Sequence, residues 1–262
     1  MSNVYEHTYA VCAYKESQYL EDCVKSLLNQ TVKSKIVIAT STPNDHISAI
    51  AEKYGLSVFV NTGEKGIAGD WNFAYSLADT EYVTLAHQDD FYEPEYTETV
   101  LAKAKKQKKP IIVFTDYFEI RNGERVYKNK LLKIKRIMNF PLRFFRKSRF
   151  VRRRVLSLGC SICCPAVTYN IENCRNLKFD TSMQNSCDWE AWERLSKYKG
   201  AFVYVKSRLM GHRIHRESTT TEMIQNSKRA EEELMLFKRF WPNWIAVRIA
   251  KIFAKGAASN DL

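Results

Sequence analysis

The sequence contains no apolar run of about 18 residues or more, which is the length that a helix needs to cross a bilayer. We therefore expect no membrane-spanning segment. Residues 1–6 are polar and no apolar block follows them, so no signal peptide is expected either. Internal repeats and low-complexity linkers are also absent, and the sequence shows no clean domain boundary.

Cysteine is present in an odd number, seven, and mostly within apolar stretches. This pattern argues against a set of structural disulfides and indicates reduced thiols in a cytosolic compartment. Cys160 and Cys163, with Cys174 and Cys187 beyond them, could be read as a zinc site. The second pair is too widely spaced for that kind of site, so zinc is disfavoured.

Acidic residues are missing from residues 125–171, and thirteen Lys and Arg residues lie between Arg125 and Arg154. The formal net charge of +12 is therefore a local feature, and the rest of the chain is close to neutral. Aliphatic and aromatic residues alternate with these cations, as in a helix that lies on an anionic membrane surface. Near such a surface each Lys or Arg contributes about 1 kcal/mol.

A second amphipathic basic segment follows Trp244 near the end of the chain. Ordinary helices with a solvated charged face remain the alternative for both segments. Contact with the membrane or the acceptor is predicted for Arg143, Arg146, Arg152, Arg153, Trp244 and Arg248.

Hydrophobic residues make up 45% of the 262 residues, which is enough for a sizeable core. Apolar segments of strand length alternate with segments of helical periodicity in the first half, which predicts an α/β fold with a mainly parallel sheet. Strands are expected at 8–14, 35–39, 56–60, 111–115, 166–169 and 201–205, and a further strand begins at Tyr82 and leads into Asp89 and Asp90. Helices are expected at 19–28, 45–54, 71–78, 95–106, 189–198 and 221–240. Gly55 should cap one of these helices, and Asn122-Gly123 should form a hairpin turn.

Two adjacent carboxylates, Asp89 and Asp90, follow the strand that begins at Tyr82. Ligands bind at the carboxyl edge of an open α/β sheet, and paired hard oxygens at that edge suit a divalent cation that carries a diphosphate. A solvated acidic turn is the alternative when this segment is taken alone.

Three further segments together resemble the family 2 glycosyltransferases of GT-A fold. They are Val11-Cys-Ala-Tyr-Lys-Glu16 followed by Ser26-Leu-Leu-Asn-Gln-Thr31, the turn Asn61-x-Gly-x-x-Gly66 with Asn72, and Leu85-Ala-His-Gln-Asp-Asp90. The resemblance covers residues 8 to about 220. It implies a catalytic domain at 1–220 and a helical extension at 221–262. The domain would have a nucleotide-sugar half at 1–115 and an acceptor half at 116–220, with a basic insertion at 125–157.

The resemblance also implies a metal site for Mg²⁺ or Mn²⁺ at Asp89, Asp90 and His215. Asp89 falls on the last acid of the family's Asp-x-Asp motif, and His87 replaces the first acid. Asp90 would ligate the cation or hold the site from a second shell. His215 belongs to Arg213-Ile-His215, which with Ser218 to Thr220 is similar to a later motif of the family.

Asp188, in Cys187-Asp-Trp-Glu-Ala-Trp-Glu-Arg-Leu195, matches the family's later Glu-Asp motif. The match makes it the expected general base, and an N-cap role at the start of a helix would be compatible. Where the family usually reads uracil with an Asp, this chain has Thr40-Ser-Thr42, so a UDP-sugar is only the default donor. The residues expected at the donor are Tyr14, Glu16, Thr40, Ser41, Gly66, Asn72, Gln88 and Arg213.

The sequence thus predicts an inverting glycosyltransferase, peripheral to the inner face of the plasma membrane, that acts on a glycan or lipid-linked acceptor in polysaccharide assembly. Two other classes of protein stay open. The basic aromatic stretch could bind nucleic acid, although no nucleic-acid motif surrounds it. A metal-dependent nucleotidyltransferase would also need a strand-end acid pair. Near its amino terminus, however, this chain lacks the Gly-rich phosphate loop with a following Lys that such an enzyme would use.

Overall fold

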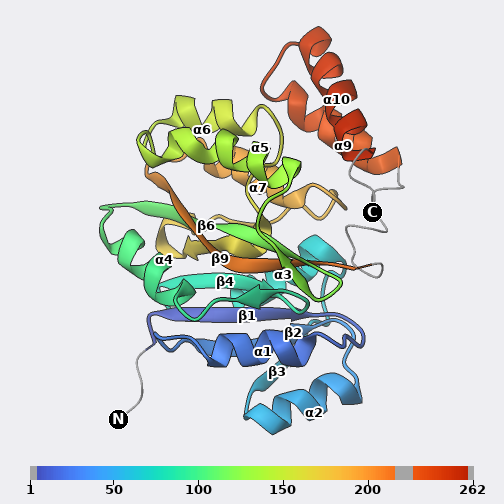
Figure 1. The fold of residues 1–262 in the computed structure, drawn as a ribbon. Helices are drawn as coiled ribbons and strands as arrows, with labels where there is room; N and C mark the ends of the chain where they lie inside the picture. The colour runs from blue at the N-terminus through green and yellow to red at the C-terminus, as the bar shows by residue number, and fades with distance from the viewer. Residues whose placement is uncertain (1–4, 216–226, 259–262) are drawn as a thin grey trace.

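The computed structural model describes residues 5–215 and 227–258, in which a nine-stranded sheet separates two layers of helices (Figure 1). Its parallel part contains β1 (His7–Ala13), β2 (Lys35–Thr40), β3 (Ser57–Val60) and β4 (Tyr82–His87). These strands pair in the order β3-β2-β1-β4, and all three pairings are parallel. The strand-helix alternation of the first half therefore folds as predicted.

Three helices connect the parallel strands: α1 (Leu20–Leu28), α2 (Asp45–Tyr54) and α3 (Ile67–Ser76). Local sequence signals fix the ends of α2. The Asn44 side chain accepts a hydrogen bond from the Ile47 N–H at 2.9 Å, and Gly55 ends the helix in the left-handed region at φ 63°. The predicted glycine cap is confirmed.

Beyond β4 the sheet becomes mixed. The added strands are β5 (Phe91–Tyr92), β6 (Pro110–Arg121), β7 (Glu124–Val126), β8 (Val167–Asn170) and β9 (Ala201–Ile214). β8 runs antiparallel to both β4 and β6, whereas β6 and β9 are parallel. The predicted parallel arrangement thus holds for the first four strands. β6 and β7 form the predicted hairpin, with Asn122 and Gly123 at φ 50° and 81°.

The helices of the second half are α4 (Tyr96–Lys105), α5 (Lys130–Asn139), α6 (Arg149–Leu156), α7 (Cys187–Leu195), α9 (Ser227–Lys238) and α10 (Asn243–Ala258). Short 3-10 turns are η1 (Phe140–Arg143), η2 (Cys164–Ala166) and η3 (Glu172–Cys174). The basic stretch is therefore two helices separated by η1, which contains Pro141. The predicted helix at 221–240 is described from Ser227 onward, and residues 221–226 lie outside the described part.

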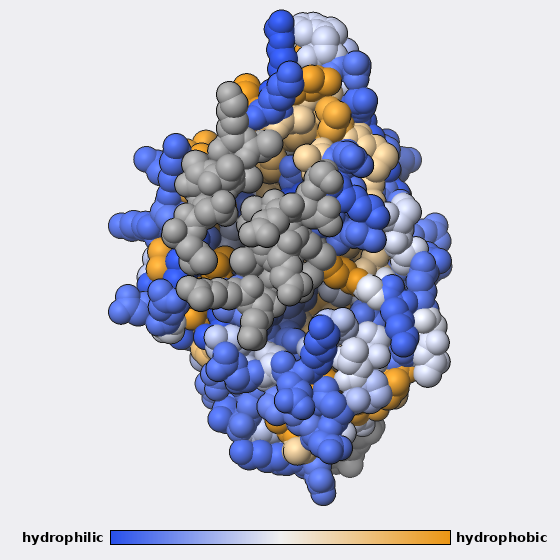
Figure 2. Space-filling model, turned by 90° about the vertical axis from the view of Figure 1, so that its right-hand side faces the viewer, coloured by the Kyte–Doolittle hydropathy of each residue, from blue (hydrophilic) through white to orange (hydrophobic). Residues whose placement is uncertain are grey.

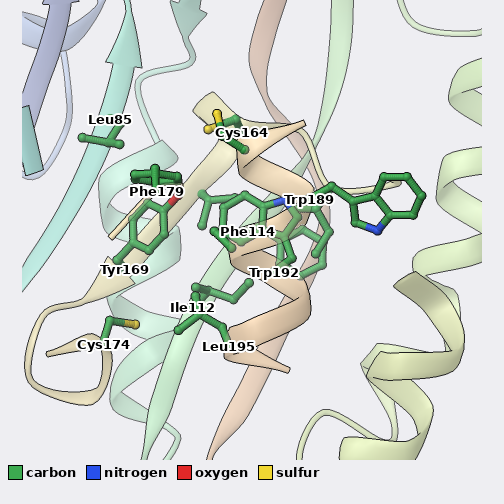
Figure 3. Packing of buried hydrophobic residues seen from close by; sticks show 14 of the residues in the cluster. Leu85, Ile112, Phe114, Cys164, Tyr169, Cys174, Phe179, Trp189, Trp192 and Leu195 are labelled. Atoms are coloured by element: carbon green, nitrogen blue, oxygen red, sulfur yellow. The ribbon is translucent and has the colours of Figure 1, made fainter. Parts of the chain in front are cut away.

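Alternating side chains of the sheet fill two cores. Tyr9, Val11 and Ala13 of β1 pack with α1, α2 and α4, whereas Ala10 of the same strand packs on the opposite face. That second core receives large aromatic residues from α7, with Trp192 stacked on Tyr169 at 5.7 Å between ring centroids (Figure 3). It fixes α7, and with it the segment that carries Asp188, against the middle of the sheet.

Arg152 is among the residues predicted to contact the membrane or the acceptor, and this prediction is wrong. The side chain is fully buried. Its guanidinium donates hydrogen bonds to the carbonyls of Ser196, Tyr198 and Gly200, directly after α7, and lies over the Phe202 ring. Three carbonyl acceptors compensate the burial of the charge, so Arg152 attaches α6 to the end of α7.

Candidate functional site

His87, Asp89 and Asp90 form a cluster at the carboxyl end of β4. Each residue offers one possible ligand atom, and these atoms lie within 4.8 Å of one another. β4 ends at His87, and a turn closed by the Asp90 N–H donating to the His87 carbonyl brings the two acids back beside the strand end. The sequence predicted Asp89 and Asp90 at this edge, and the structure places them there.

Asp90 is almost completely buried. Its Oδ1 accepts hydrogen bonds from the backbone N–H of Arg213 and from His212 Nδ1, both at 3.0 Å. Its Oδ2 has no hydrogen-bond partner among the described residues and lies 3.9 Å from His87 Nδ1. His212 was not predicted. Its only sequence signal is its position directly before the Arg213-Ile-His215 motif.

The end of β9 brings this motif to Asp89. His215 Nε2 lies 3.0 Å from Asp89 Oδ2, and Arg213 Nε donates to the Asp89 carbonyl at 2.9 Å. The Arg213 guanidinium also lies over the Tyr19 ring, at 4.2 Å from its centroid. Arg213 and His215 are therefore brought together with the acid pair. Ser218 to Thr220 of the predicted motif lie outside the described residues.

The ionisation states of this cluster fit a cation. Burial opposes ionisation of Asp89, but the hydrogen bond from His215 and the charges of His87 and His212 outweigh it and lower its pKa. Burial lowers the pKa of His87, which favours the neutral imidazole that a metal requires. His87 Nε2 and Asp90 Oδ2 are buried without partners among the described residues, so both are available as ligands.

His212 behaves differently from His87. Burial lowers the pKa of His212, but the charge and hydrogen bond of Asp90 and the charge of Asp89 outweigh that effect, and its pKa is raised. His212 therefore acts as a donor that fixes the Asp90 carboxylate rather than as a ligand.

Asp188 lies in the first turn of α7 and is half-buried. The helix begins at Cys187, so Asp188 stands inside the helix and is not its N-cap. Its Oδ1 accepts from the Trp189 N–H at 2.6 Å, and the Cys160 thiol lies 3.6 Å from its Oδ2. Burial raises the pKa of Asp188, and these two donors limit the rise. A carboxylate with a raised pKa is suited to accept a proton.

Asp188 and the cluster on β4 share one electrostatic environment. The pKa of His87 responds to the charge of Asp188 as well as to those of Asp90 and Asp89. Trp71 of α3 connects the two regions, because it stacks on His87 at 5.1 Å and meets Phe179 edge-on at 5.2 Å between centroids. Phe179 precedes the loop that leads to Asp188.

The loops after β1 and β4 are joined by Gln88. Its amide accepts from the Tyr14 N–H at 3.0 Å and donates to the Tyr14 carbonyl at 2.8 Å. The Tyr14 and Glu16 side chains are exposed beside this connection. Gly66 precedes α3 at φ 90°, a conformation that favours glycine. Tyr14 and Glu16 are therefore positioned at the predicted edge, while Gln88 holds that edge together.

Two residues predicted to bind the sugar donor instead make hydrogen bonds within the protein. Thr40 is 1% exposed and its hydroxyl accepts from the Thr42 N–H, so it does not face a donor. The Asn72 amide accepts from the Phe179 N–H at 2.7 Å and donates to its carbonyl at 2.9 Å. These two predictions are corrected: Thr40 shapes the turn after β2, and Asn72 anchors the Phe179 segment to α3.

Ser41 is linked to an acid that the sequence did not single out. Its hydroxyl donates to Asp70 Oδ2 at 2.9 Å, and Asn61 Nδ2 donates to Asp70 Oδ1 at 2.8 Å. Asp70 thus ties the end of β2 to the Gly-rich turn and to α3. Its signal in the sequence is a lone acid between Gly66 and Asn72.

Aromatic and basic side chains form a surface on η1, α6 and α10. We call it the aromatic-basic surface, and its exposed members are Phe140, Arg143, Phe144, Phe145, Phe150, Trp244 and Arg248. Arg154 links its two parts, because its guanidinium lies over both Phe150 and Trp241. Figure 2 shows apolar side chains gathered at the upper end of the molecule, where Figure 1 places α9 and α10.

The predicted basic residues differ in their surroundings. Arg143 lies over the rings of Phe140 and Phe144, and Arg248 lies over Trp244. Arg146 donates to the Arg143 carbonyl. Arg153 instead pairs with buried Glu193 at 2.6 Å. Across residues 5–215 and 227–258, no helix combines the length and apolarity needed to cross a membrane.

The sequence of the chain is similar to a known protein family and to named relatives. Residues 8–170 match the model of glycosyl transferase family 2. Chondroitin synthase of Escherichia coli is 24% identical over 223 residues, which cover 82% of this chain and 30% of that protein. Chondroitin synthase of Pasteurella multocida is 33% identical over 108 residues, covering 39% and 11%. The chain thus spans less than a third of the length of these two relatives.

Solved structures agree on the fold. The structure of S. aureus TarS 1-349 in complex with UDP-GlcNAc has a TM-score of 0.66 at 14% identity, and the match covers 94% of this chain and 70% of that chain. A second crystal structure of S. aureus TarS 1-349 has a TM-score of 0.63 at 13% identity, and the match covers 94% of this chain and 69% of that chain. At these identities the likeness is one of fold.

Proposed function

The chain belongs to glycosyl transferase family 2, and from this membership we propose that it transfers a sugar from a nucleoside-diphosphate sugar to an acceptor hydroxyl with inversion. UDP is the default nucleotide, since TarS of similar fold was solved with UDP-GlcNAc. The relatives named chondroitin synthase favour a glycan, free or lipid-linked, as the acceptor in polysaccharide assembly. Family membership also favours this function over a nucleic-acid-binding module or a nucleotidyltransferase.

The observation that carries the proposal is that three groups of residues lie near one another. The His87, Asp89 and Asp90 cluster follows β4, Arg213 and His215 come from the end of β9, and Asp188 lies within electrostatic reach of His87. The residues present fit Mg²⁺ or Mn²⁺, because the carboxylates suit both ions and the imidazole of His87 is best tolerated by Mn²⁺. A bound cation would neutralise the diphosphate and stabilise it as a leaving group.

The chain's own residues supply the remaining chemistry. The Arg213 guanidinium, held by the Asp89 carbonyl and the Tyr19 ring, would bind a phosphate oxygen. Asp188 would accept the proton of the acceptor hydroxyl as that oxygen bonds to the anomeric carbon. The bond between that carbon and the diphosphate oxygen breaks in the same displacement, and the nucleoside diphosphate leaves with the electron pair. A single displacement inverts the anomeric centre.

Two variants test the assignment after a thermal-shift screen of nucleotide sugars with Mn²⁺ has found a donor. Asp188→Asn should bind that donor normally but transfer its sugar roughly 10²-fold to 10⁴-fold more slowly, because the base is lost. Asp89→Ala should lose the Mn²⁺-dependent part of donor binding in calorimetry. Asp22→Asn, an exposed acid on α1, is the matched control. Unimpaired turnover by Asp188→Asn, or equal donor affinity with and without Mn²⁺, would refute the respective role.

We also propose that the protein attaches peripherally to the inner face of the plasma membrane through the aromatic-basic surface. Phe144, Phe150 and Trp244 are 65%, 72% and 62% exposed, which is unusual for large apolar side chains. Arg143 and Arg248 lie beside these rings and add positive charge. Aromatic side chains that insert at the interface and cations that meet anionic headgroups together favour such attachment.

A further inference from the structure

The inner face of α5 carries cations, although the sequence predicts that the basic stretch as a whole lies on a membrane surface. Leu132, Lys135, Arg136 and Asn139 share one face at helical spacing, and all four are buried or half-buried. Arg136 pairs with Asp116 at 2.6 Å, and Asn139 donates to the Ser161 carbonyl. Lys135, the other cation on this face, has no such partner: no carboxylate of the described residues lies within ion-pair distance of it.

Lys135 is held by a tyrosine instead. Its Nζ donates to the Tyr117 hydroxyl at 3.0 Å and lies 5.4 Å from the centroid of the same ring. Burial lowers the pKa of Lys135, but the interactions with Tyr117 and Cys163 outweigh it, and its pKa is raised. The ammonium is therefore charged at neutral pH. A half-buried charge that lacks a counter-ion is costly to the folded protein.

The Lys135 ammonium lies close enough to the proposed site to act on two of its residues. Its charge lowers the pKa of Asp188 and also acts on His212, the donor to Asp90. Tyr117, which holds Lys135, meets the His212 ring edge-on at 6.2 Å between centroids. Lys135 therefore lies near both the proposed base and His212, in the region where the two sugars of a transfer reaction would meet.

The nucleotide diphosphate already has partners at the other end of this region, in Arg213 and the β4 cluster. Lys135 is instead supplied by the acceptor half, beside Asp188. We propose that Lys135 forms an anion subsite that binds a carboxylate or phosphate carried by one of the two sugars joined at Asp188. This inference rests on the proposed function and deepens it, since it makes the substrate an acidic sugar.

Calorimetry in the presence of Mn²⁺ tests the subsite in two arms. The donor arm compares UDP-glucuronic acid with UDP-glucose. The acceptor arm, with UDP present, compares a disaccharide ending in glucuronic acid with its carboxyl-reduced form, which ends in glucose, and with the 6-phosphate ester of that reduced form. We expect the wild type to prefer the charged probe about tenfold or more in one arm, which identifies the sugar that carries the anion and whether it is a carboxylate or a phosphate.

Variants assign that preference to Lys135. Lys135→Met should abolish the preference, and Lys135→Arg should retain part of it. Lys133→Met, on the exposed side of the same helix, should leave it unchanged. Lys135→Gln, which can still donate to Tyr117, replaces Lys135→Met if the latter fails to fold by its melting transition. Equal affinity for charged and neutral probes in both arms, or a preference that survives the loss of Lys135, overturns the subsite.

The binding of UDP itself separates this inference from the proposed function. All variants of residues 133 and 135 should bind UDP with Mn²⁺ as the wild type does. A wild type that binds no nucleotide refutes the proposed function, whereas normal UDP binding without a charge preference refutes only the subsite.

Discussion

Asp188 has two unequal hydrogen-bond donors, the backbone N–H of Trp189 and the thiol of Cys160. The first is fixed by α7 and cannot be removed by a side-chain substitution. The second comes from a different segment and stabilises the ionised carboxylate, so it lowers a pKa that burial raises. Cys160 is therefore a positioning residue whose loss should appear in the pH dependence of the reaction.

At this scale we predict that Cys160→Ala shifts the acidic limb of the kcat profile to higher pH. Removing a donor destabilises the carboxylate, its pKa rises further, and a higher pH is needed to deprotonate the base. Cys160→Ser should keep the limb close to that of the wild type. The measurement is kcat against pH for all three proteins. A limb that moves to lower pH, or does not move in Cys160→Ala, contradicts the assignment.

Residue predictions from the sequence succeeded where neighbouring positions share one loop or strand end. Asp89 and Asp90 were placed correctly because a strand end fixes where the next residues go. His212 and Lys135 were missed. A histidine in a strand, or one lysine among thirteen basic residues, carries no sequence signal of its tertiary contacts with Asp90 and Tyr117. Arg152 was misjudged for the same reason: its three carbonyl partners follow a helix more than forty residues away.

At the scale of elements, α9 holds the approach to α7. The Glu232 carboxylate on α9 accepts hydrogen bonds from the backbone N–H groups of Gln184, Asn185 and Ser186 at 2.8, 2.9 and 3.0 Å. The glutamate is 4% exposed, so its bonds are shielded from water. Asp188 follows this loop by two residues. The C-terminal helices thereby act on the position of the proposed base.

We predict that Glu232→Ala lowers the free energy of unfolding by about 3 kcal/mol, because three amide groups, one buried and two partly buried, lose their acceptor. It should also reduce kcat for sugar transfer while leaving UDP affinity unchanged, since the β4 cluster is not touched. Urea unfolding and calorimetry measure the two effects. Glu231→Ala changes an exposed neighbour on the same helix and is the control. Equal stability and kcat in the two variants would show that the contact has no effect on either.

The first four strands and their helices were predictable because apolar length and periodicity are local properties. The direction of β8 was not, since a short apolar segment looks the same in parallel and antiparallel pairs. β9 was expected to end at Val205 but continues to Ile214. Lys206 interrupts the apolar pattern there, and the strand continues because β6 supplies a parallel partner along its whole length.

For the whole molecule, the aromatic-basic surface and the edge strand β3 lie at opposite ends in Figure 1. Contact through η1, α6 and α10 would leave the parallel half of the sheet facing away from the bilayer. The half that we propose to bind the nucleotide sugar would then remain accessible to a donor dissolved in water.

We predict that the protein co-sediments with vesicles containing phosphatidylserine, less with neutral vesicles, and less again at high salt. The combined change Phe144→Ser, Phe145→Ser and Trp244→Ser should reduce the bound fraction severalfold. Phe59→Ser removes a partly exposed aromatic ring from β3 and is the control. Identical sedimentation of the triple variant and the wild type would refute the membrane role of this surface.

The three amide groups that point at Glu232 also limit how such chains can be recombined. A chimera that took residues 1–215 from this protein and its last helices from a distant transferase would inherit the β4 cluster whole. Its proposed base, however, would follow a loop facing a foreign helix. A chimera with exchanged C-terminal helices should therefore keep a glutamate at this position. Without it, we expect the chimera to bind the nucleotide but to transfer the sugar slowly.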